Sequence, residues 1–181
     1  MQHLVSNNLY FQYNVCTDSD IFRLREYYYT LKEEERVDLP EVRKVGRKLI
    51  QASELPNYTK KMYQLLDLYL PTEPTDKYEI RRYSYFRYRP GDLFKRHTDF
   101  TKKDNPYEER RFSTITLTKK TFDLEGGDLI IWNEDKTKSI KIELELGDSV
   151  IFDTKYFHEV TEIKKGYRES IIGWVHYKYP T

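Results

Sequence analysis

The spacing of apolar residues changes once along this chain, and that change constrains the fold more than any other feature. Up to about residue 70, apolar side chains recur every three or four positions; after residue 76 they alternate with polar ones. The first period is that of an amphipathic helix, and the second is that of a strand with one buried face. We therefore expect helices in the first part of the chain and a β-rich second part.

Three stripes of helical period precede the sequence PTEPT at 71–75, which interrupts the pattern. The stripes are Ile21, Leu24, Tyr28 and Leu31; Val42, Val45, Leu49 and Ala52; and Met62, Leu65, Leu66 and Tyr69. Asp18 or Asp20 is expected to cap the first helix, because a short acidic side chain can accept hydrogen bonds from the first turn. No titratable cluster lies on the apolar faces, so these helices are expected to be scaffold.

Seven segments after residue 76 have the strand period and are separated by turn sequences such as RPGD, EGGD and ELGD. The segments are 78–88, 112–119, 128–132, 138–144, 148–152, 157–163 and 168–177. Many short strands at close spacing predict an antiparallel sandwich or a jelly roll. We expect a mainly β fold with flanking helices: residues 1–76 form a helical support on one sheet, and residues 77–181 form the β core of the same domain.

Composition excludes several classes of protein. No stretch approaches the roughly 18 consecutive apolar residues of a membrane span, and the first residues lack a signal-peptide pattern. The single cysteine, Cys16, excludes a disulfide framework and a thiolate zinc cluster. We expect no membrane association and a cytoplasmic location. With 17 Tyr, 9 Phe and 2 Trp, aromatic side chains are expected to supply much of the core.

Charge is balanced overall but uneven along the chain. The sequence has 31 basic and 30 acidic side chains, yet residues 77–111 contain eleven Lys or Arg against six Asp or Glu. Such a segment could favour an anionic small molecule, an acidic peptide or a nucleic-acid backbone. The alternative is a solvated strand face on which arginine stems cover aromatic rings.

The stretch RYRPGDLFKRHTDF at 87–100 contains a candidate metal site. His97 and Asp99 are two residues apart, so in an extended segment their side chains point to the same side. Together with a histidine from another strand they would make a two-histidine, one-carboxylate triad, which suits Fe(II) and leaves coordination positions open. His158, in DTKYFHEV, is the natural third ligand. The alternative is that the triplet occurs by chance and that each histidine is an ordinary polar group.

A second candidate site lies on the last expected strand, RESIIGWVHY. Arg168 and Ser170 share one face of this strand, and a buried arginine there needs an anionic partner. A bound carboxylate would serve, and Tyr88 on the first strand could offer its hydroxyl to the same group. The alternative is a salt bridge between Arg168 and an acid elsewhere. His176 shares the face but lies too far along the strand to join the metal site.

Several motifs taken together resemble a known family over residues 78–177. In chain order they are Tyr88, His97 with Asp99, EGGDL at 125–129, LGDSVIF at 146–152, His158, Arg168 and Trp174. Their order and spacing are similar to those of the iron- and 2-oxoglutarate-dependent dioxygenases, in particular the prolyl 4-hydroxylase-like branch with its bacterial PKHD-type hydroxylases. The resemblance implies a double-stranded β-helix, which is a jelly roll, as the core.

The resemblance also implies two sets of site residues. The set expected to hold Fe(II) is His97, Asp99 and His158, and the set expected to bind 2-oxoglutarate is Arg168, Tyr88 and Ser170. Gly126 and Gly127 match a glycine pair beside the site, whose physical use is a tight turn with close backbone approach. The sequence differs from the collagen-type enzymes in two places. Phe94 stands where they have a tyrosine, and the glycine pair is followed by Asp128 and Leu129, which is nearer to the bacterial pattern than to the collagen-type one.

The implied activity is hydroxylation of an unactivated C–H bond, with O2 and 2-oxoglutarate as co-substrates, succinate and CO2 as co-products and ascorbate as reductant. A protein or peptide side chain is the first expected substrate, and a free amino acid or small acidic metabolite is the alternative. Nucleic acid ranks lower. An alternative of another class is a jelly-roll protein that binds a metal or ligand without turnover. Exposed sheet edges would permit a homodimer.

Overall fold

Strands dominate the structure, a computed structural model that describes residues 4–6, 9–31, 35–39, 42–100 and 102–179. Within these ranges twelve strands form one sheet with the order β1-β2-β10-β7-β12-β5-β4-β6-β11-β8-β9, and β3 pairs with β4. The strands are β1 (Leu4–Ser6), β2 (Phe11–Asn14), β3 (Glu35–Leu39), β4 (Arg43–Gln51), β5 (Tyr78–Tyr88), β6 (Leu93–His97), β7 (Arg110–Lys120), β8 (Leu129–Trp132), β9 (Ser139–Ile142), β10 (Asp148–Asp153), β11 (Phe157–Val160) and β12 (Arg168–Tyr177). The helices are α1 (Asp18–Thr30) and α2 (Pro56–Tyr69).

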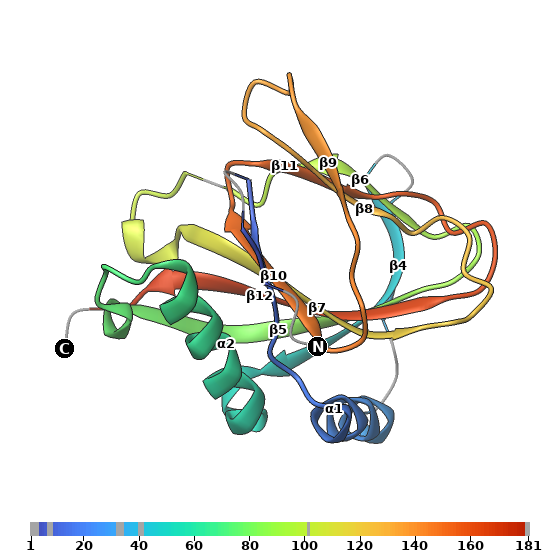
Figure 1. The fold of residues 1–181 in the computed structure, drawn as a ribbon, viewed down its shortest axis with the longest axis horizontal. Helices are drawn as coiled ribbons and strands as arrows, with labels where there is room; N and C mark the ends of the chain where they lie inside the picture. Colours follow the sequence, from blue (N-terminus) through green and yellow to red (C-terminus); the bar gives the residue numbers. More distant parts are fainter. Residues whose placement is uncertain (1–3, 7–8, 32–34, 40–41, 101, 180–181) are drawn as a thin grey trace.

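Strand β4 turns the sheet back on itself. Its residues 46–51 pair with β5, whereas Arg43 and Lys44 pair with β6. The result is a larger layer with β2, β10, β7, β12 and β5, and a smaller layer with β6, β11, β8 and β9, which face each other in Figure 1. Neighbouring strands pair antiparallel, as β12 does with both β5 and β7. The expected jelly-roll architecture is confirmed.

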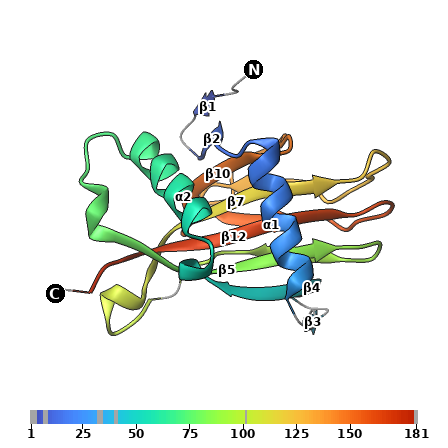
Figure 2. The same ribbon diagram turned by 90° about the horizontal axis from the view of Figure 1, so that it is seen from below.

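Helices α1 and α2 cover the face of the larger layer that points away from the smaller layer (Figures 1 and 2). Each carries one of the predicted stripes, so these two helices are confirmed. The N-cap of α1 is Thr17 rather than an aspartate: its hydroxyl accepts a hydrogen bond from the backbone N–H of Asp20, whose carboxylate in turn accepts from the N–H of Thr17. This reciprocal pair is a capping box, which satisfies two donors at once.

The helix predicted from the stripe at 42–52 is wrong, because this segment is mostly strand β4. Val45 and Ile50 are buried, but Val42 and Leu49 are 45% and 48% exposed, so the stripe is not one buried face. β-branched residues and a glycine at position 46 disfavour a helix. Pairing with β3 on one edge and with β5 and β6 on the other satisfies the backbone of the segment and decides its conformation.

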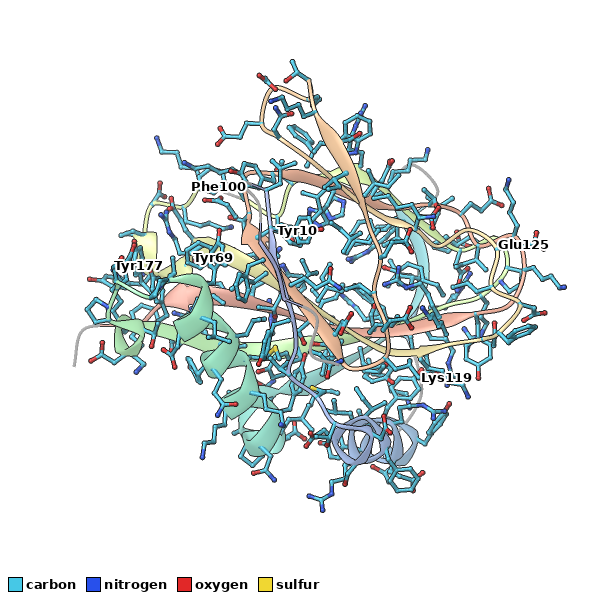
Figure 3. The ribbon with its side chains drawn as sticks, viewed as in Figure 1. Tyr10, Tyr69, Phe100, Lys119, Glu125 and Tyr177 are labelled. Atoms are coloured by element: carbon cyan, nitrogen blue, oxygen red, sulfur yellow. The ribbon has the colours of Figure 1, made fainter. Side chains whose placement is uncertain are left out.

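Two apolar cores lie on opposite faces of the larger layer, and β5 contributes to both. Tyr83 and Tyr85 pack against the helices, while Phe86 and Tyr88 pack between the layers. All four side chains are at most 1% exposed, as expected of an aromatic-rich core. Figure 3 shows side chains filling both spaces. A strand buried on both faces can position polar groups in the interior, and the site described below depends on this.

The predicted strands at 78–88 and 168–177 coincide with β5 and β12. The strand predicted at 157–163 is shorter in the structure, where β11 ends at Val160, and β6 was not predicted. Strands β2 and β4, from the first 76 residues, pair with strands of the later part, so the first part adds to the sheet as well as supporting it. Among the described residues, no helix combines the length and apolar character that crossing a bilayer requires.

Candidate metal centre

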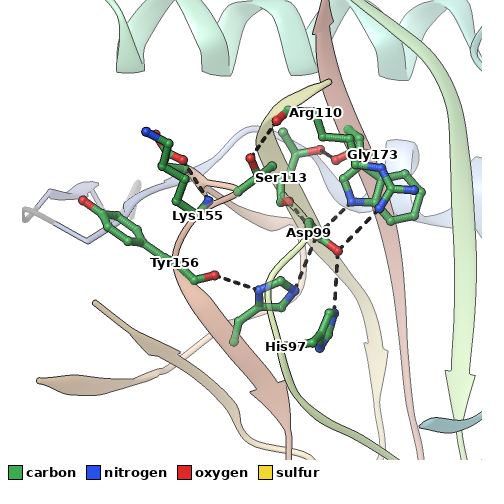
Figure 4. Close-up of polar contacts among 12 residues, drawn as sticks. His97, Asp99, Arg110, Ser113, Lys155, Tyr156 and Gly173 are labelled. Atoms are coloured by element: carbon green, nitrogen blue, oxygen red, sulfur yellow. Dashed lines mark hydrogen bonds and ion pairs between the residues drawn. The ribbon is translucent and has the colours of Figure 1, made fainter. Parts of the chain in front are cut away.

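His97, Asp99 and His158 come together between the two layers. His97 ends β6, Asp99 follows two residues later, and His158 lies on β11 directly opposite His97 in the strand pairing. One potential ligand atom from each residue lies within 4.8 Å of the others. The structure therefore brings together the three residues singled out from the sequence, and Figure 4 shows His97 beside Asp99. His176 does not belong to this cluster.

Both imidazole rings are oriented by backbone carbonyl groups. Nδ1 of His97 lies 2.8 Å from the carbonyl oxygen of Lys95, and Nδ1 of His158 lies 3.4 Å from that of Tyr156. A proton on Nδ1 satisfies these carbonyls and leaves the Nε2 lone pair available as a ligand. The ring of Phe94 stacks on His97 with 3.9 Å between centroids, which further restricts the imidazole. The residue that differs from the collagen-type pattern thus packs directly against the cluster.

The Nε2 atoms of both histidines point toward the carboxylate of Asp99. The distances are 3.6 Å from His97 to Oδ1 and 3.4 Å from His158 to Oδ2. Burial alone would raise the pKa of Asp99, but the two histidines and a hydroxyl donor hold it well below its usual value. Burial lowers the pKa of His158 to about 4. At neutral pH the cluster is therefore a carboxylate with a neutral buried imidazole, which is the protonation that metal binding requires.

Two residues that sequence reasoning had not linked to Asp99 fix its carboxylate. The hydroxyl of Ser113 donates to Oδ2 at 2.7 Å, and the indole N–H of Trp174 donates to the same oxygen at 2.8 Å. Ser113 on β7 and Trp174 on β12 are opposite each other in the strand pairing, so one register places both donors. Trp174 had been noted as part of the motif, but nothing in the sequence marks Ser113 among the polar residues of its strand.

Replacing Trp174 with phenylalanine tests this positioning. The change keeps an aromatic ring and removes the N–H donor, and loss of such an outer partner typically weakens metal binding roughly tenfold or more. We expect the dissociation constant for Mn(II), measured from the free-ion electron paramagnetic resonance signal, to rise by that factor. Trp132→Phe is the matched control, because the Trp132 indole nitrogen has no hydrogen-bond partner among the described residues. Equal Mn(II) affinities in the two variants would contradict a positioning role for Trp174.

Arg168 is buried between the layers beside Tyr88. The two residues are directly opposite each other on β12 and β5, and the guanidinium carbon lies 5.8 Å from the centre of the Tyr88 ring. Nη1 of Arg168 donates to the carbonyl oxygen of Gly127 at 2.5 Å. Within the described part of the chain, Nε and Nη2 of Arg168 and the hydroxyl of Tyr88 have no hydrogen-bond partner. Ser170 is also buried and lies two residues further along β12, opposite Phe86 of β5.

Burial strongly disfavours the charge on Arg168 and lowers its pKa. Isolated buried charges are costly, and buried polar groups are normally hydrogen-bonded. The salt bridge considered as the alternative is not found, since no carboxylate of the described residues pairs with Arg168. Two unpartnered guanidinium nitrogens beside an unpartnered phenol are the arrangement that a carboxylate ligand would satisfy.

The glycine pair allows this arrangement. A Cβ on Gly126 would lie 1.9 Å from the carbonyl oxygen of Glu162, and one on Gly127 would lie 2.3 Å from Ile163 and 3.2 Å from Arg168. Both glycines also have positive φ, +78° and +70°, which L side chains rarely adopt. The expected tight turn with close backbone approach is confirmed. The turn brings the Gly127 carbonyl onto the guanidinium of Arg168.

The donor set fits a ferrous ion. Two imidazole nitrogens and one carboxylate form the facial triad of non-haem Fe(II) sites. The buried guanidinium of Arg168, which keeps two nitrogens without a hydrogen-bond partner among the described residues, fits a co-substrate with a carboxylate. The cluster borders a cavity of about 570 Å³ whose lining includes His97, Asp99 and Trp174. A substrate could therefore approach the triad from this side.

Part of the sequence is similar to that of known hydroxylases. Over 75 residues it is 36% identical to a PKHD-type hydroxylase from Prochlorococcus marinus, a stretch that covers 40% of this chain and 33% of that protein. The chain thus matches about a third of the length of such relatives.

Solved structures share the fold. A prolyl-4-hydroxylase from Pseudomonas putida has a TM-score of 0.71 at 21% identity, covering 94% of this chain and 93% of that one. A viral collagen prolyl hydroxylase from Paramecium bursaria Chlorella virus-1, in its 2-oxoglutarate complex, has a TM-score of 0.68 at 18% identity, covering 95% and 98%. At these identities the likeness shows the fold.

The sequence profile of the 2OG-Fe(II) oxygenase superfamily matches residues 83–176. The match includes the three residues of the His–Asp–His cluster together with Tyr88, Arg168 and Ser170, and it covers more than half of the chain. The chain belongs to the 2OG-Fe(II) oxygenase superfamily.

Proposed function

We propose that this protein is an Fe(II)- and 2-oxoglutarate-dependent hydroxylase acting on a protein or peptide side chain. One observation carries the proposal: the buried guanidinium of Arg168, with two nitrogens that have no hydrogen-bond partner among the described residues, lies in the same interlayer core as the His–Asp–His cluster. A cation without a counterion is costly in an apolar core, and the cost is offset when a carboxylate ligand binds.

His97, Asp99 and His158 would hold the iron, and Arg168 with Tyr88 and Ser170 would bind the distal carboxylate of 2-oxoglutarate. When bound, iron, 2-oxoglutarate and O2 supply the oxidising power that converts a C–H bond to C–OH, with succinate and CO2 as co-products. Ser113 and Trp174 keep the Asp99 carboxylate in one orientation. The apolar residues of the interlayer core, such as Phe86 and Phe152, exclude water from the co-substrate site.

A peptide substrate is supported by the relatives. The fold is shared with a viral collagen prolyl hydroxylase, whose name gives a protein substrate, and part of the sequence is similar to a PKHD-type hydroxylase. A free amino acid or small acidic metabolite is the alternative, and ascorbate is proposed as the reductant that keeps iron ferrous.

Succinate formation tests the proposal. Purified protein with Fe(II), ascorbate and 2-oxoglutarate is expected to form succinate, and to form more when a peptide pool from a cell lysate is added. The succinate is measured by mass spectrometry, and a parallel search finds peptides that gained one oxygen atom. A chelator that removes iron is the control and is expected to abolish both signals. Succinate no higher than in the chelated control would contradict the proposal and favour a non-catalytic binding protein.

A further inference from the structure

Arginines line the cavity that borders the metal cluster. Arg43 and Arg47 come from β4, Arg82 from β5 and Arg110 from β7. Among the described residues that line this 570 Å³ cavity, Asp99 is the one acidic residue. Figure 4 shows Arg110 close to Asp99. Four guanidinium groups from three strands therefore converge on the space next to the triad, where a substrate would lie.

Two of the four arginines have a carboxylate partner and two have none among the described residues. Arg47 pairs with Glu35, and Arg110 lies 3.7 Å from Asp99, the carboxylate assigned to the metal. Arg43 and Arg82 have no carboxylate partner among the described residues, and the Nε atom of Arg43 is buried without a hydrogen-bond partner. Burial and the neighbouring Arg47 lower the pKa of Arg43. The wall thus attracts anions and repels cations.

The basic surface continues beyond this cavity. An adjoining cavity of about 540 Å³ shares Arg82, Arg110 and Trp174 with the first. It adds Lys103, the acidic residue Glu108, and Arg81, which pairs with Glu79. The two cavities share three lining residues and therefore adjoin, and only the first of them is lined by His97 and Asp99. We refer to the two adjoining cavities together as the groove. Basic side chains outnumber acidic ones in both cavities, and two adjoining cavities of this kind fit an extended chain carrying several negative groups better than a small anion.

The aromatic rings of the groove favour carboxylates over nucleic-acid bases. The guanidinium of Arg110 lies 4.1 Å from the centre of the Trp174 ring, and that of Arg81 lies 4.7 Å from the centre of the Tyr179 ring. Stacking of single-stranded bases requires an aromatic face that is open. Here a guanidinium already covers one face of each ring. Arg81 is held by Glu79 and by the carbonyl groups of Tyr107 and Tyr177, whereas the guanidinium of Arg110 suits contacts with carboxylates.

We propose that the groove formed by the two cavities binds an acidic peptide segment, whose Asp or Glu side chains contact Arg82 and Arg43 while the residue to be hydroxylated lies at the metal cluster. This inference rests on the proposed function and specifies its substrate class. It accounts for the local excess of basic residues between positions 77 and 111, which the balanced net charge conceals.

Peptide binding to the full chain loaded with Mn(II) and N-oxalylglycine, an inert mimic of 2-oxoglutarate, tests the inference. Three fluorescent peptides of equal length are compared by anisotropy: one rich in Glu, one rich in Gln and one rich in Lys. We expect the Glu-rich peptide to bind at least roughly tenfold tighter than the Gln-rich one, since each hydrogen bond to a charged group typically contributes that factor. The Lys-rich peptide should bind weakest, and salt should weaken the Glu-rich complex.

Two arginine variants test where the Glu-rich peptide binds. Arg82→Gln is expected to weaken binding of the Glu-rich peptide roughly tenfold. Arg23→Gln is the matched control: Arg23 is an exposed arginine on α1, which covers the opposite face of the larger layer, and its loss should leave the affinity as it was. Thermal unfolding of each variant verifies that it is folded.

Three results would overturn the inference: equal affinities for the three peptides, tighter binding of an oligothymidylate than of the Glu-rich peptide, or displacement of that peptide by an equal concentration of free glutamate. The first would show no selection by charge, the second would indicate a nucleic acid, and the third a small metabolite. Calorimetry of N-oxalylglycine binding separates the two proposals. Absence of that binding contradicts the proposed function, whereas mimic binding without charge selection contradicts this inference alone.

Discussion

His97→Ala is expected to abolish tight binding of ferrous iron and, with it, succinate formation. The variant removes one of three protein ligands, and because loss of an outer partner alone typically weakens metal binding roughly 10- to 100-fold, loss of a ligand should exceed about 100-fold. His97 is the most suitable of the three for this test, since its side chain is 21% exposed whereas those of Asp99 and His158 are 8% and 7% exposed. The variant should therefore fold. Mn(II) titration and Fe(II) retention after gel filtration measure the effect.

His176→Ala is the matched control for this experiment. His176 is also a partly buried histidine at the far end of β12, and the residues that can share a metal ion do not include it. The control should keep the metal affinity of the original protein. If His97→Ala bound Mn(II) as tightly as the control, the histidine would be an ordinary polar residue and the metal assignment would be wrong.

Arg168→Met is expected to leave iron in place and to raise the concentration of 2-oxoglutarate needed for half-saturation roughly 100-fold. Methionine has nearly the same reach but carries no charge, and truncating one partner of a buried charge pair typically costs about 2–5 kcal/mol. The same change should not lower the free energy of unfolding, because the buried guanidinium has two unpartnered nitrogens in the described structure. Arg168→Lys should retain part of the affinity, because the charge remains. Unfolding in urea and succinate kinetics provide the two measurements.

Arg87→Met is the control, and it is expected to lower stability without changing the 2-oxoglutarate requirement. Arg87 lies on the other face of the larger layer and pairs at 2.5 Å with Glu169, which is fully buried. Its removal should lower the free energy of unfolding by about 2 kcal/mol, since it leaves a buried carboxylate with fewer partners, and it should leave the 2-oxoglutarate requirement as it was. An unchanged 2-oxoglutarate requirement in Arg168→Met would remove the co-substrate assignment.

The parts of the fold that could be predicted are those in which a local pattern and the tertiary structure agree. Strands β5 and β12 alternate regularly and end at turn sequences, so their predicted bounds were correct. The segment 42–52 has apolar spacing compatible with either helix or strand, and the choice is made by β5, a strand more than 25 residues away along the chain. Such pairing is not visible in the segment itself.

The candidate site could also be predicted only in part, because contacts between distant strands are not visible in the sequence. His97, Asp99 and His158 were chosen from residue type and spacing, because metal binding requires specific donors. Ser113 is one of several small polar residues on β7, and its contact with Asp99 depends on its pairing with Trp174, in a ladder that shifts register twice. The four arginines of the cavity come from three strands, so their convergence follows from the curl of the sheet at β4.

A crystal structure of the protein with Mn(II) and N-oxalylglycine is the most direct test of the central claim, that one interlayer site holds both a metal ion and a carboxylate co-substrate. The account predicts Mn(II) bound to Nε2 of His97 and His158 and to the carboxylate of Asp99, with the distal carboxylate of the mimic on the guanidinium of Arg168. A metal ion bound elsewhere, or a mimic whose carboxylate does not reach Arg168, would contradict it.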